Sequence, residues 1–150
     1  MLKTIYTTLA TLLLVAMMST TVLAQDHSQN WESGYVVGVS EVHIKPGMFN
    51  AYVNDLNGLW RKYLDEQKKD GSVISYGVFS NVAAREGEPD LYLTVTYANW
   101  AAFDRGDEYF EKIREKVIGS EEAMRSAGVK REELRTLGSS YNLQEIKFKD

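Results

Sequence analysis

The sequence predicts one α+β domain, in which a four-stranded antiparallel sheet has helices on only one of its faces. Two observations lead to this fold class. Apolar residues recur with a period of two in short segments and with a period near 3.6 in the longer segments between them. The resulting order is strand, helix, strand, strand, helix, strand. Right-handed crossovers then place both helical segments on the same side of the sheet.

The first predicted strand and helix occupy residues 34–71. The strand, residues 34–45, is rich in β-branched side chains and ends at Pro46-Gly47, because proline has no N–H to donate to a sheet. A single long helix is predicted over residues 48–69, before the helix-terminating signal of Gly71. Its apolar residues recur at three- and four-residue steps and form one broad stripe: Phe49, Tyr52, Val53, Leu56, Leu59, Trp60, Tyr63 and Leu64.

The second and third strands are predicted at residues 72–79 and 91–97. The segment between them, residues 81–90, is rich in polar residues and contains glycine and proline, so it is predicted to be a loop that joins an antiparallel hairpin. Because side chains alternate along a strand, the second strand is expected to divide its residues between two faces. One face receives Val73, Ser75, Gly77 and Phe79, and the other receives Ile74, Tyr76 and Val78.

The second helical region begins at Asn99, a favourable N-cap residue. Gly106 is predicted to interrupt this region and Gly119 to end it. One or two further short helices are expected, with a break at Gly128 and with Ser120 as the predicted cap. These helices occupy residues 120–127 and 130–137, and the last strand occupies residues 140–148.

The N-terminus has the features of a secretory signal peptide. One basic residue, Lys3, precedes an apolar run at residues 9–18, and small residues follow up to Ala24. The run is too short to cross a bilayer, which requires about 20 residues. Cleavage is expected before Gln25. The predicted organisation is therefore a signal peptide at residues 1–24, a flexible leader at residues 25–33 and a single domain at residues 34–150.

Composition limits the classes of protein to consider. Lys3 is the only charged residue of the expected signal peptide, so its removal makes the net charge of −4 one unit more negative. An acidic chain without a basic face does not favour nucleic-acid binding. The sequence has no cysteine, so neither a disulfide framework nor a lipid-modified cysteine is expected. We expect an exported protein of the periplasm or the exterior, with no membrane attachment after signal cleavage.

The face of the sheet that lacks helices is expected to need a cover. Val37, Val39 and Tyr92 would otherwise contribute to an exposed apolar patch, and such patches usually mark an interface. A two-fold symmetric homodimer that packs two of these open faces together is the simplest arrangement. The sequence therefore predicts a homodimer.

The chain resembles a known group of proteins. The strand that ends in Lys45-Pro46-Gly47, the amphipathic helix, the hairpin and the segment Tyr97-Ala-Asn-Trp100-Ala-Ala-Phe103 are similar to the dimeric α/β-barrel superfamily. This superfamily has the ferredoxin-like βαββαβ fold and includes antibiotic-biosynthesis-type monooxygenases and NIPSNAP-like proteins. The resemblance implies a barrel made of two sheets, with a small-molecule cavity inside it or between sheet and helices. It does not imply one reaction, because such folds support many.

One polar cluster is the candidate site. His43 and Glu41 share a face of the first strand, and the expected strand order places Tyr92 beside them. A carboxylate near an imidazole favours its charged form and can prepare it as a general base. We therefore consider His43, Glu41 and Tyr92 as catalytic candidates. The candidate ligand-binding residues are Thr94, Thr96 and Tyr141. The alternative is a half-exposed histidine that is hydrogen-bonded in a dimer interface.

Other groups of residues have simpler interpretations. Six aromatic residues at helical spacing are predicted to be core rather than the lining of a pocket: Trp60, Tyr63, Trp100, Phe103, Tyr109 and Phe110. The charged segments 112–116 and 131–135 are predicted to be solvated helix faces. Asp104, Asp107 and Glu108 favour a helix start more than a Mg²⁺ or Ca²⁺ site.

Several chemistries are not expected. With one histidine in the predicted domain and no cysteine, a zinc or transition-metal cluster is not expected. Some relatives bind haem through a histidine on a helix, and the predicted helices contain none. No phosphate loop or dinucleotide motif is present. We expect no cofactor and no metal.

Three functions are consistent with these observations. The first is an exported homodimer that binds a small, partly apolar or aromatic ligand. The second is a cofactor-independent monooxygenase or isomerase in which His43 or Tyr92 handles a proton. The third is a protein-interaction module that uses the open sheet face or the helices of residues 120–137.

Overall fold

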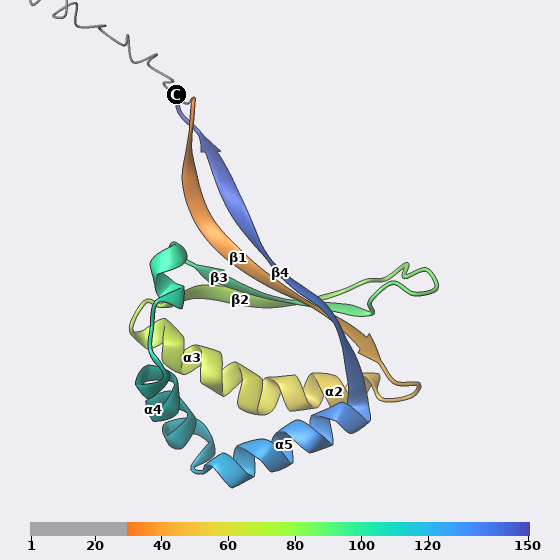
Figure 1. Cartoon of the computed structure of the whole chain (residues 1–150). Helices are drawn as coiled ribbons and strands as arrows, with labels where there is room; N and C mark the ends of the chain where they lie inside the picture. Colours follow the sequence, from red (N-terminus) through yellow and green to blue (C-terminus); the bar gives the residue numbers. More distant parts are fainter. Residues whose placement is uncertain (1–29) are drawn as a thin grey trace, which may run out of the picture.

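The computed structural model of the chain describes residues 30–150 (Figure 1). The expected signal peptide, and residues 25–29 of the expected leader, lie outside the described residues. The described part forms one antiparallel sheet with helices on one side. The predicted α+β, ferredoxin-like βαββαβ fold is confirmed.

The sheet contains four strands in the order β2-β3-β1-β4, and each neighbouring pair is antiparallel. Their bounds are β1 Trp31–Ile44, β2 Val73–Ser80, β3 Leu91–Tyr97 and β4 Arg135–Phe148. The two central strands, β1 and β3, are far apart in sequence and pair from Val36 with Tyr97 to Val42 with Leu91. This order is the one that two right-handed βαβ units produce.

The first helical segment is broken into three pieces, whereas the sequence predicted one continuous helix. These pieces are α2 Phe49–Asp55, a π-helical turn η1 Leu56–Trp60 and α3 Arg61–Lys69. Gly58 has φ −84° and ψ −106°, which is not helical, and it introduces a kink. Glycine tolerates this conformation because it has no Cβ.

The second helical segment also has three pieces. They are the 3₁₀ turn η2 Trp100–Phe103, α4 Asp107–Ile118 and α5 Glu121–Leu134. The predicted caps are confirmed, because Asn99 accepts a hydrogen bond from Ala101 N and Ser120 accepts one from Ala123 N. Gly119, with φ +90°, ends α4. The predicted break at Gly128 is wrong, because α5 continues through it.

Strand β4 is longer than the sequence predicted. It begins at Arg135 rather than Ser140, so the expected helix over residues 130–137 ends at Leu134. The predicted solvated face at residues 131–135 is also wrong in part. The guanidinium of Arg131 pairs with Asp55 of α2, and its side chain is only 20% exposed. This ion pair joins the two helical segments.

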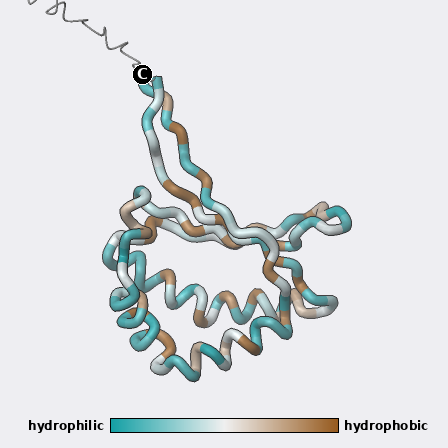
Figure 2. The backbone as a smooth tube through the Cα atoms, viewed as in Figure 1, coloured by the Kyte–Doolittle hydropathy of each residue, from teal (hydrophilic) through white to brown (hydrophobic). Residues whose placement is uncertain are grey.

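Strands β1 and β4 extend beyond the other two strands as a two-stranded ribbon. Trp31 pairs with Phe148, whereas the pairing of β1 with β3 starts only at Val36. The ribbon bends away from the helices, toward the uncovered side of the sheet (Figure 1). Apolar residues recur along both of its strands (Figure 2). The expectation of a loose leader is therefore wrong for Trp31–Ser33, which are part of β1.

The core lies between the sheet and helix α2. Five buried side chains form it, and they come from β1, β3 and the first helical segment: Val42, Tyr52, Leu56, Leu91 and Leu93. By contrast, most of β4 is exposed on both faces. The central strands β1 and β3 are therefore more buried than the edge strands β2 and β4.

Candidate functional site

The predicted site residues lie together on the open face of the sheet. In the pairing of β1 with β3, Glu41 is opposite Tyr92, Val39 is opposite Thr94 and Val37 is opposite Thr96. On the other side of β1, Val39 is opposite Tyr141 of β4. Because these positions alternate with the buried Val36 and Val42, they share the face without helices. The strand order thus gathers residues from three strands.

Glu41 and His43 lie over the backbone of β4 at Gly138. The carboxylate of Glu41 accepts a hydrogen bond from Ser139 N at 3.1 Å. A Cβ added at Gly138 would lie 2.9 Å from Glu41 Cβ and 3.1 Å from His43 Nε2. Real Cβ atoms essentially never approach a neighbour within 3.0 Å. The glycine at residue 138 is therefore what allows these two side chains to lie against β4.

Tyr92 has a perturbed phenol. Desolvation and the negative charge of Glu41 raise the pKa of Tyr92 above its ordinary value, with smaller contributions from Tyr141 and Glu88. All three neighbours act in the same direction, so the phenol stays protonated at neutral pH and can donate a hydrogen bond. This cluster can bind a polar group, and it provides an acid and a carboxylate on one surface.

A second feature, which the sequence analysis missed, lies on the helix side of the sheet. It is a cleft of about 270 Å³, here named the sheet cleft. Its lining comes from β1, β3 and β4 and from Trp60 at the end of η1: Gly38, Val39, Ser40, Trp60, Leu93, Val95, Tyr97, Ser140, Tyr141 and Asn142. Of the three predicted ligand-binding residues, Tyr141 lines the sheet cleft, whereas Thr94 and Thr96 are not among its lining residues.

Small residues explain why the sheet cleft exists. Gly38 and Ser40 alternate with the open-face residues of β1, and in β4 they pair with Asn142 and Ser140. Side chains this small do not fill the space beneath the sheet. A Cβ at Gly38 would lie 3.2 Å from Asn142 Oδ1 and 3.6 Å from Tyr97 Cε2. The sequence signal that could have revealed the cleft is in β1. Its core-facing positions 38 and 40 hold glycine and serine, where a packed core favours large apolar residues.

The polar groups of the sheet cleft are neutral. The hydroxyls of Ser40 and Ser140 are hydrogen-bonded to each other at 3.2 Å. Burial and the neighbouring Tyr63 raise the pKa of Tyr97, which keeps its phenol neutral as well. With the amide of Asn142, the cleft offers hydroxyl and amide partners beside apolar walls, and no lining residue carries a charge.

Trp60 also lines two other clefts. One, of about 260 Å³, lies between α3, α4 and α5 and is here named the helix cleft; its lining is Leu59, Trp60, Tyr63, Ile118, Met124, Ala127, Gly128 and Arg131. The other, of about 300 Å³, lies beside β2 and includes Val53, Leu56, Tyr76 and Val78. The predicted core role holds in part for Trp60, which is half-buried and packs against the core cluster while it also lines these clefts. Tyr63 is a half-buried cleft residue and does not belong to that cluster.

The other predicted core aromatics are also not buried. Trp100 and Phe103 are 51% and 43% exposed. They stack on each other, and Phe103 contacts Tyr97 at a ring-centroid distance of 4.7 Å. Tyr109 bonds to Ser72, with 2.8 Å between the two hydroxyl oxygens, and so joins α4 to the end of α3. These residues tie η2 and α4 to the sheet and to α3.

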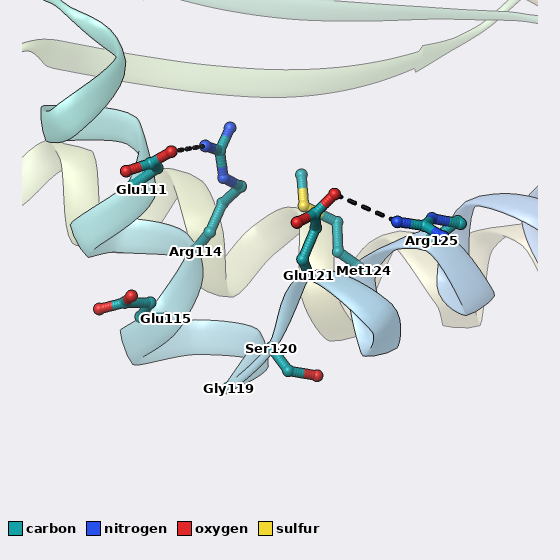
Figure 3. A pocket seen from close by; sticks show the side chains of 8 residues that line it. All are labelled: Glu111, Arg114, Glu115, Gly119, Ser120, Glu121, Met124 and Arg125. Carbon is teal, nitrogen blue, oxygen red and sulfur yellow. Dashed lines mark hydrogen bonds and ion pairs between the residues drawn. The ribbon is translucent and has the colours of Figure 1, made fainter.

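A further hollow, of about 630 Å³, is a charged notch at the turn between α4 and α5 (Figure 3). Its side chains alternate in charge, and Arg114–Glu111 and Arg125–Glu121 form ion pairs of 3.7 and 3.2 Å. Glu111 and Glu121 are largely exposed. Exposed pairs of this kind contribute little energy. The predicted solvated face of residues 112–116 agrees with this arrangement.

The possible metal-binding side chains of residues 30–150 do not gather into a metal site. No group of three or more histidine, cysteine or acidic residues in this range is arranged to hold a metal ion. Asp107 and Glu108 occupy the first turn of α4, where negative charge favours the helix dipole. None of the helices in the same range has both the length and the hydropathy of a membrane span.

The sequence matches no protein-family model and no curated protein. Three solved structures illustrate what the fold is similar to. A protein from Shewanella oneidensis is 13% identical with a TM-score of 0.47, and the match covers 78% of this chain and 98% of the other. A dimeric ferredoxin-like protein from an uncultured marine organism is 12% identical with a TM-score of 0.48, over 76% and 96% of the two chains.

The third structure is a candidate antibiotic biosynthesis monooxygenase from Chloroflexus aurantiacus. It is 12% identical with a TM-score of 0.41, over 74% of this chain and 92% of the other. Of the groups that the sequence resembled, these matches include the antibiotic-biosynthesis type of monooxygenase. The ferredoxin-like fold of this chain rests on its own strand order, β2-β3-β1-β4, with helices on one face.

Proposed function

We propose that the protein is a homodimer that binds a small, neutral, partly apolar or aromatic molecule in the sheet cleft. The proposal rests on one observation. In the cleft, uncharged hydrogen-bonding groups face an apolar wall that includes Trp60. Ligand sites in proteins are typically concave, and a few polar groups in them fix the orientation of the ligand.

Charge limits the class of ligand. The polar groups of Ser40, Ser140 and Asn142 are uncharged, and no acidic or basic residue lines the sheet cleft. An ion moved into such a site loses its hydration without gaining an opposite charge, which is costly. A neutral ring with a hydroxyl or carbonyl at its edge satisfies both the apolar wall and the polar groups.

The homodimer is supported by the open face of the sheet. Phe79, Tyr141 and Leu143 are 58%, 41% and 52% exposed on that side. In addition, β2 is an edge strand whose eight residues, Val73–Ser80, include no charged residue and no proline. Unprotected edges of this kind pair readily with another strand. A second copy of the chain would cover both the apolar face and this edge.

A pair of ligands that differ in charge tests the binding site. We expect 1-naphthol to bind saturably and 1-naphthalenesulfonate to bind at least tenfold more weakly, as measured by isothermal titration calorimetry. Gly38→Val should abolish naphthol binding, because its side chain meets Asn142 and Tyr97. Val82→Ala is the control, since Val82 is 95% exposed in a distant loop. Equal binding of both ligands, or unchanged binding to Gly38→Val, would contradict the proposal.

A matched pair of charge insertions tests the homodimer. Phe79→Lys places a charge on the open face, whereas Val82→Lys places the same charge in the exposed loop after β2. Sedimentation velocity should show a dimer for the wild type and for Val82→Lys. Phe79→Lys should shift the population toward monomer. A monomeric wild type at micromolar concentration would overturn the dimer.

A second candidate function is a cofactor-independent monooxygenase- or isomerase-like enzyme. The observation in its favour is that Glu41, His43 and Tyr92 gather on the open face, which a dimer would enclose. A proton-handling role predicts that His43→Gln loses turnover of a bound ligand while keeping its affinity. If turnover persists in His43→Gln, the cluster serves the interface instead.

We also propose that the protein is exported after removal of residues 1–24. The support is the sequence pattern of the first 24 residues. N-terminal sequencing of the protein from its producing cells should begin at Gln25. An intact Met1 on the protein recovered would argue against cleavage.

A further inference from the structure

The sheet cleft and the helix cleft share one lining residue, Trp60, at the end of the kinked turn η1. The helix cleft differs from the sheet cleft in its chemistry, because Leu59, Ile118, Met124 and Ala127 contribute only apolar atoms from their side chains. The two clefts therefore adjoin the same indole and differ in their lining, which is partly polar in the sheet cleft and mostly apolar in the helix cleft.

The rim of the helix cleft does not supply a free charge. Arg131 is its one lining residue with a charge, and the guanidinium is paired with Asp55. Burial raises the pKa of Tyr63, the other polar residue, which is neutral at physiological pH. An apolar chain that enters this compartment leaves no lining charge unpaired.

Trp60 stands at the boundary of the two compartments, since it lines both clefts. Its indole is half-buried and stands edge-on to Tyr76, but among the described residues no hydrogen bond to its ring nitrogen holds it in place. It follows Gly58 by two residues, and apart from the neighbouring backbone of the same helix no atom lies within 4 Å of where a Cβ of Gly58 would stand. A π-helical turn of this kind often occurs at a functional site.

We propose that the ligand is a neutral amphiphile: a hydroxylated ring held in the sheet cleft, with a short alkyl chain that passes Trp60 into the helix cleft. This rests on the proposed function and adds the second compartment to it. A ring with a hydroxyl matches the serine and asparagine side chains of the sheet cleft. An alkyl chain matches the leucine, isoleucine and methionine side chains of the helix cleft, on the other side of the Trp60 indole.

The test is a series of 4-alkylphenols from phenol to 4-octylphenol. Trp31→Phe and Trp100→Phe leave Trp60 as the single tryptophan, whose fluorescence then reports binding at the boundary of the two clefts. Each methylene that enters the helix cleft should tighten binding about fourfold, the value for a buried methylene. The gain should stop once the chain fills the cleft.

One substitution separates the helix cleft from other apolar surfaces. A Cβ at Gly128 would point into open space, so Gly128→Leu fits in α5 and fills the helix cleft. The matched control is Val129→Leu, the next residue of the same helix, which is 57% exposed and lines no part of the site. Gly128→Leu should bind phenol like the wild type and remove the gain with chain length, whereas Val129→Leu should change neither.

The outcomes distinguish this inference from the proposed function. If 1-naphthol and phenol bind but affinity does not rise with chain length, the second compartment is wrong and the sheet cleft stands. If the gain with chain length survives in Gly128→Leu, the chain lies elsewhere and the inference is also overturned. If neither 1-naphthol nor any phenol binds, the proposed function fails together with this extension.

Discussion

The indole of Trp60 stands edge-on to the ring of Tyr76, with ring centroids 5.3 Å apart and planes at 81°. Tyr76 is itself held, because its hydroxyl donates a 2.6 Å hydrogen bond to Asp65 of α3. A residue of β2 thus positions the side chain that separates the sheet cleft from the helix cleft. Edge strand, kinked helix and candidate site are connected through this one contact.

The contact predicts energetic coupling between the two rings. Edge-to-face aromatic pairs contribute about 0.5–1.5 kcal/mol beyond the area they bury. A double-mutant cycle with Trp60→Leu and Tyr76→Leu should give a coupling free energy in this range, measured by urea unfolding. Strictly additive effects of the two substitutions would mean that the rings pack independently.

Gly138→Val should destabilise the protein by about 1–3 kcal/mol, the typical cost of overpacking. The new side chain would collide with Glu41 Cβ and His43 Nε2, which lie against the glycine. Urea unfolding measures the loss. Leu137→Val is the control, because Leu137 is the preceding residue and is 51% exposed. Equal stability of the Gly138 and Leu137 variants would show that Glu41 and His43 do not rest on β4.

Asp70 predicts an acid-dependent loss of stability. Burial opposes ionisation, but hydrogen bonds from Ser72 and Tyr109 and the charge of Arg105 outweigh it, so the pKa of Asp70 lies below its ordinary value of 3.8. A carboxyl whose pKa falls on folding stabilises the folded state above that ordinary value. This contribution decreases as the pH falls from 3.8 through the lower folded pKa.

Asp70→Asn should therefore flatten the dependence of unfolding free energy on pH below about pH 4. Thermal unfolding followed by circular dichroism across pH 2.5–7, about the range where carboxyls titrate, measures this change. Asp104→Asn removes another carboxylate of the same region and controls for net charge. A curve for Asp70→Asn that stays parallel to the wild type would contradict the assigned role of this carboxyl.

Leu91→Ala should cost about 2–5 kcal/mol, because removing a buried leucine loses transfer free energy and leaves a cavity. Leu91 is 1% exposed and packs with Val42 and Tyr52 in the core under β1 and β3. Val82→Ala, in the exposed loop, should change stability by less than about 0.5 kcal/mol. Similar losses for both would place the core elsewhere.

Much of the fold follows from periodicity. Strand β3 was predicted with the bounds that the structure has, Leu91–Tyr97, because its alternation is regular and both ends have turn residues. The open-face positions of Glu41, His43 and Tyr92 also follow, since pairing with β3 keeps the period of two through β1. Local pattern and the handedness of crossovers were enough here.

Irregularities of the backbone could not be predicted from periodicity. Val73 was expected to share a face with Ser75. A register shift between these two residues instead places Val73 opposite Tyr97, where its side chain is only 1% exposed. The kink at Gly58 was not expected, because an isolated glycine is usually tolerated in a helix. A bulge or a kink changes the direction of later side chains without changing the pattern of residue types.

The sheet cleft was missed for a different reason. The cleft exists because Gly38, Ser40 and Ser140 have side chains too small to fill the space beneath the sheet. The periodicity of apolar residues in a sequence does not reveal such an unfilled volume. Trp60 was assigned to the core because its spacing fits the apolar stripe of the helix. The clefts that border the indole become evident only from the way α5 and the sheet are arranged around it.

The most direct test of the central claim is native mass spectrometry of the mature protein, purified from its producing cells, beside its Gly38→Val variant. We predict a dimer that carries a neutral small molecule in the wild type. The variant should be a dimer without that molecule. A monomeric wild type, or the same bound molecule in both proteins, would contradict a homodimer that binds its ligand in the sheet cleft.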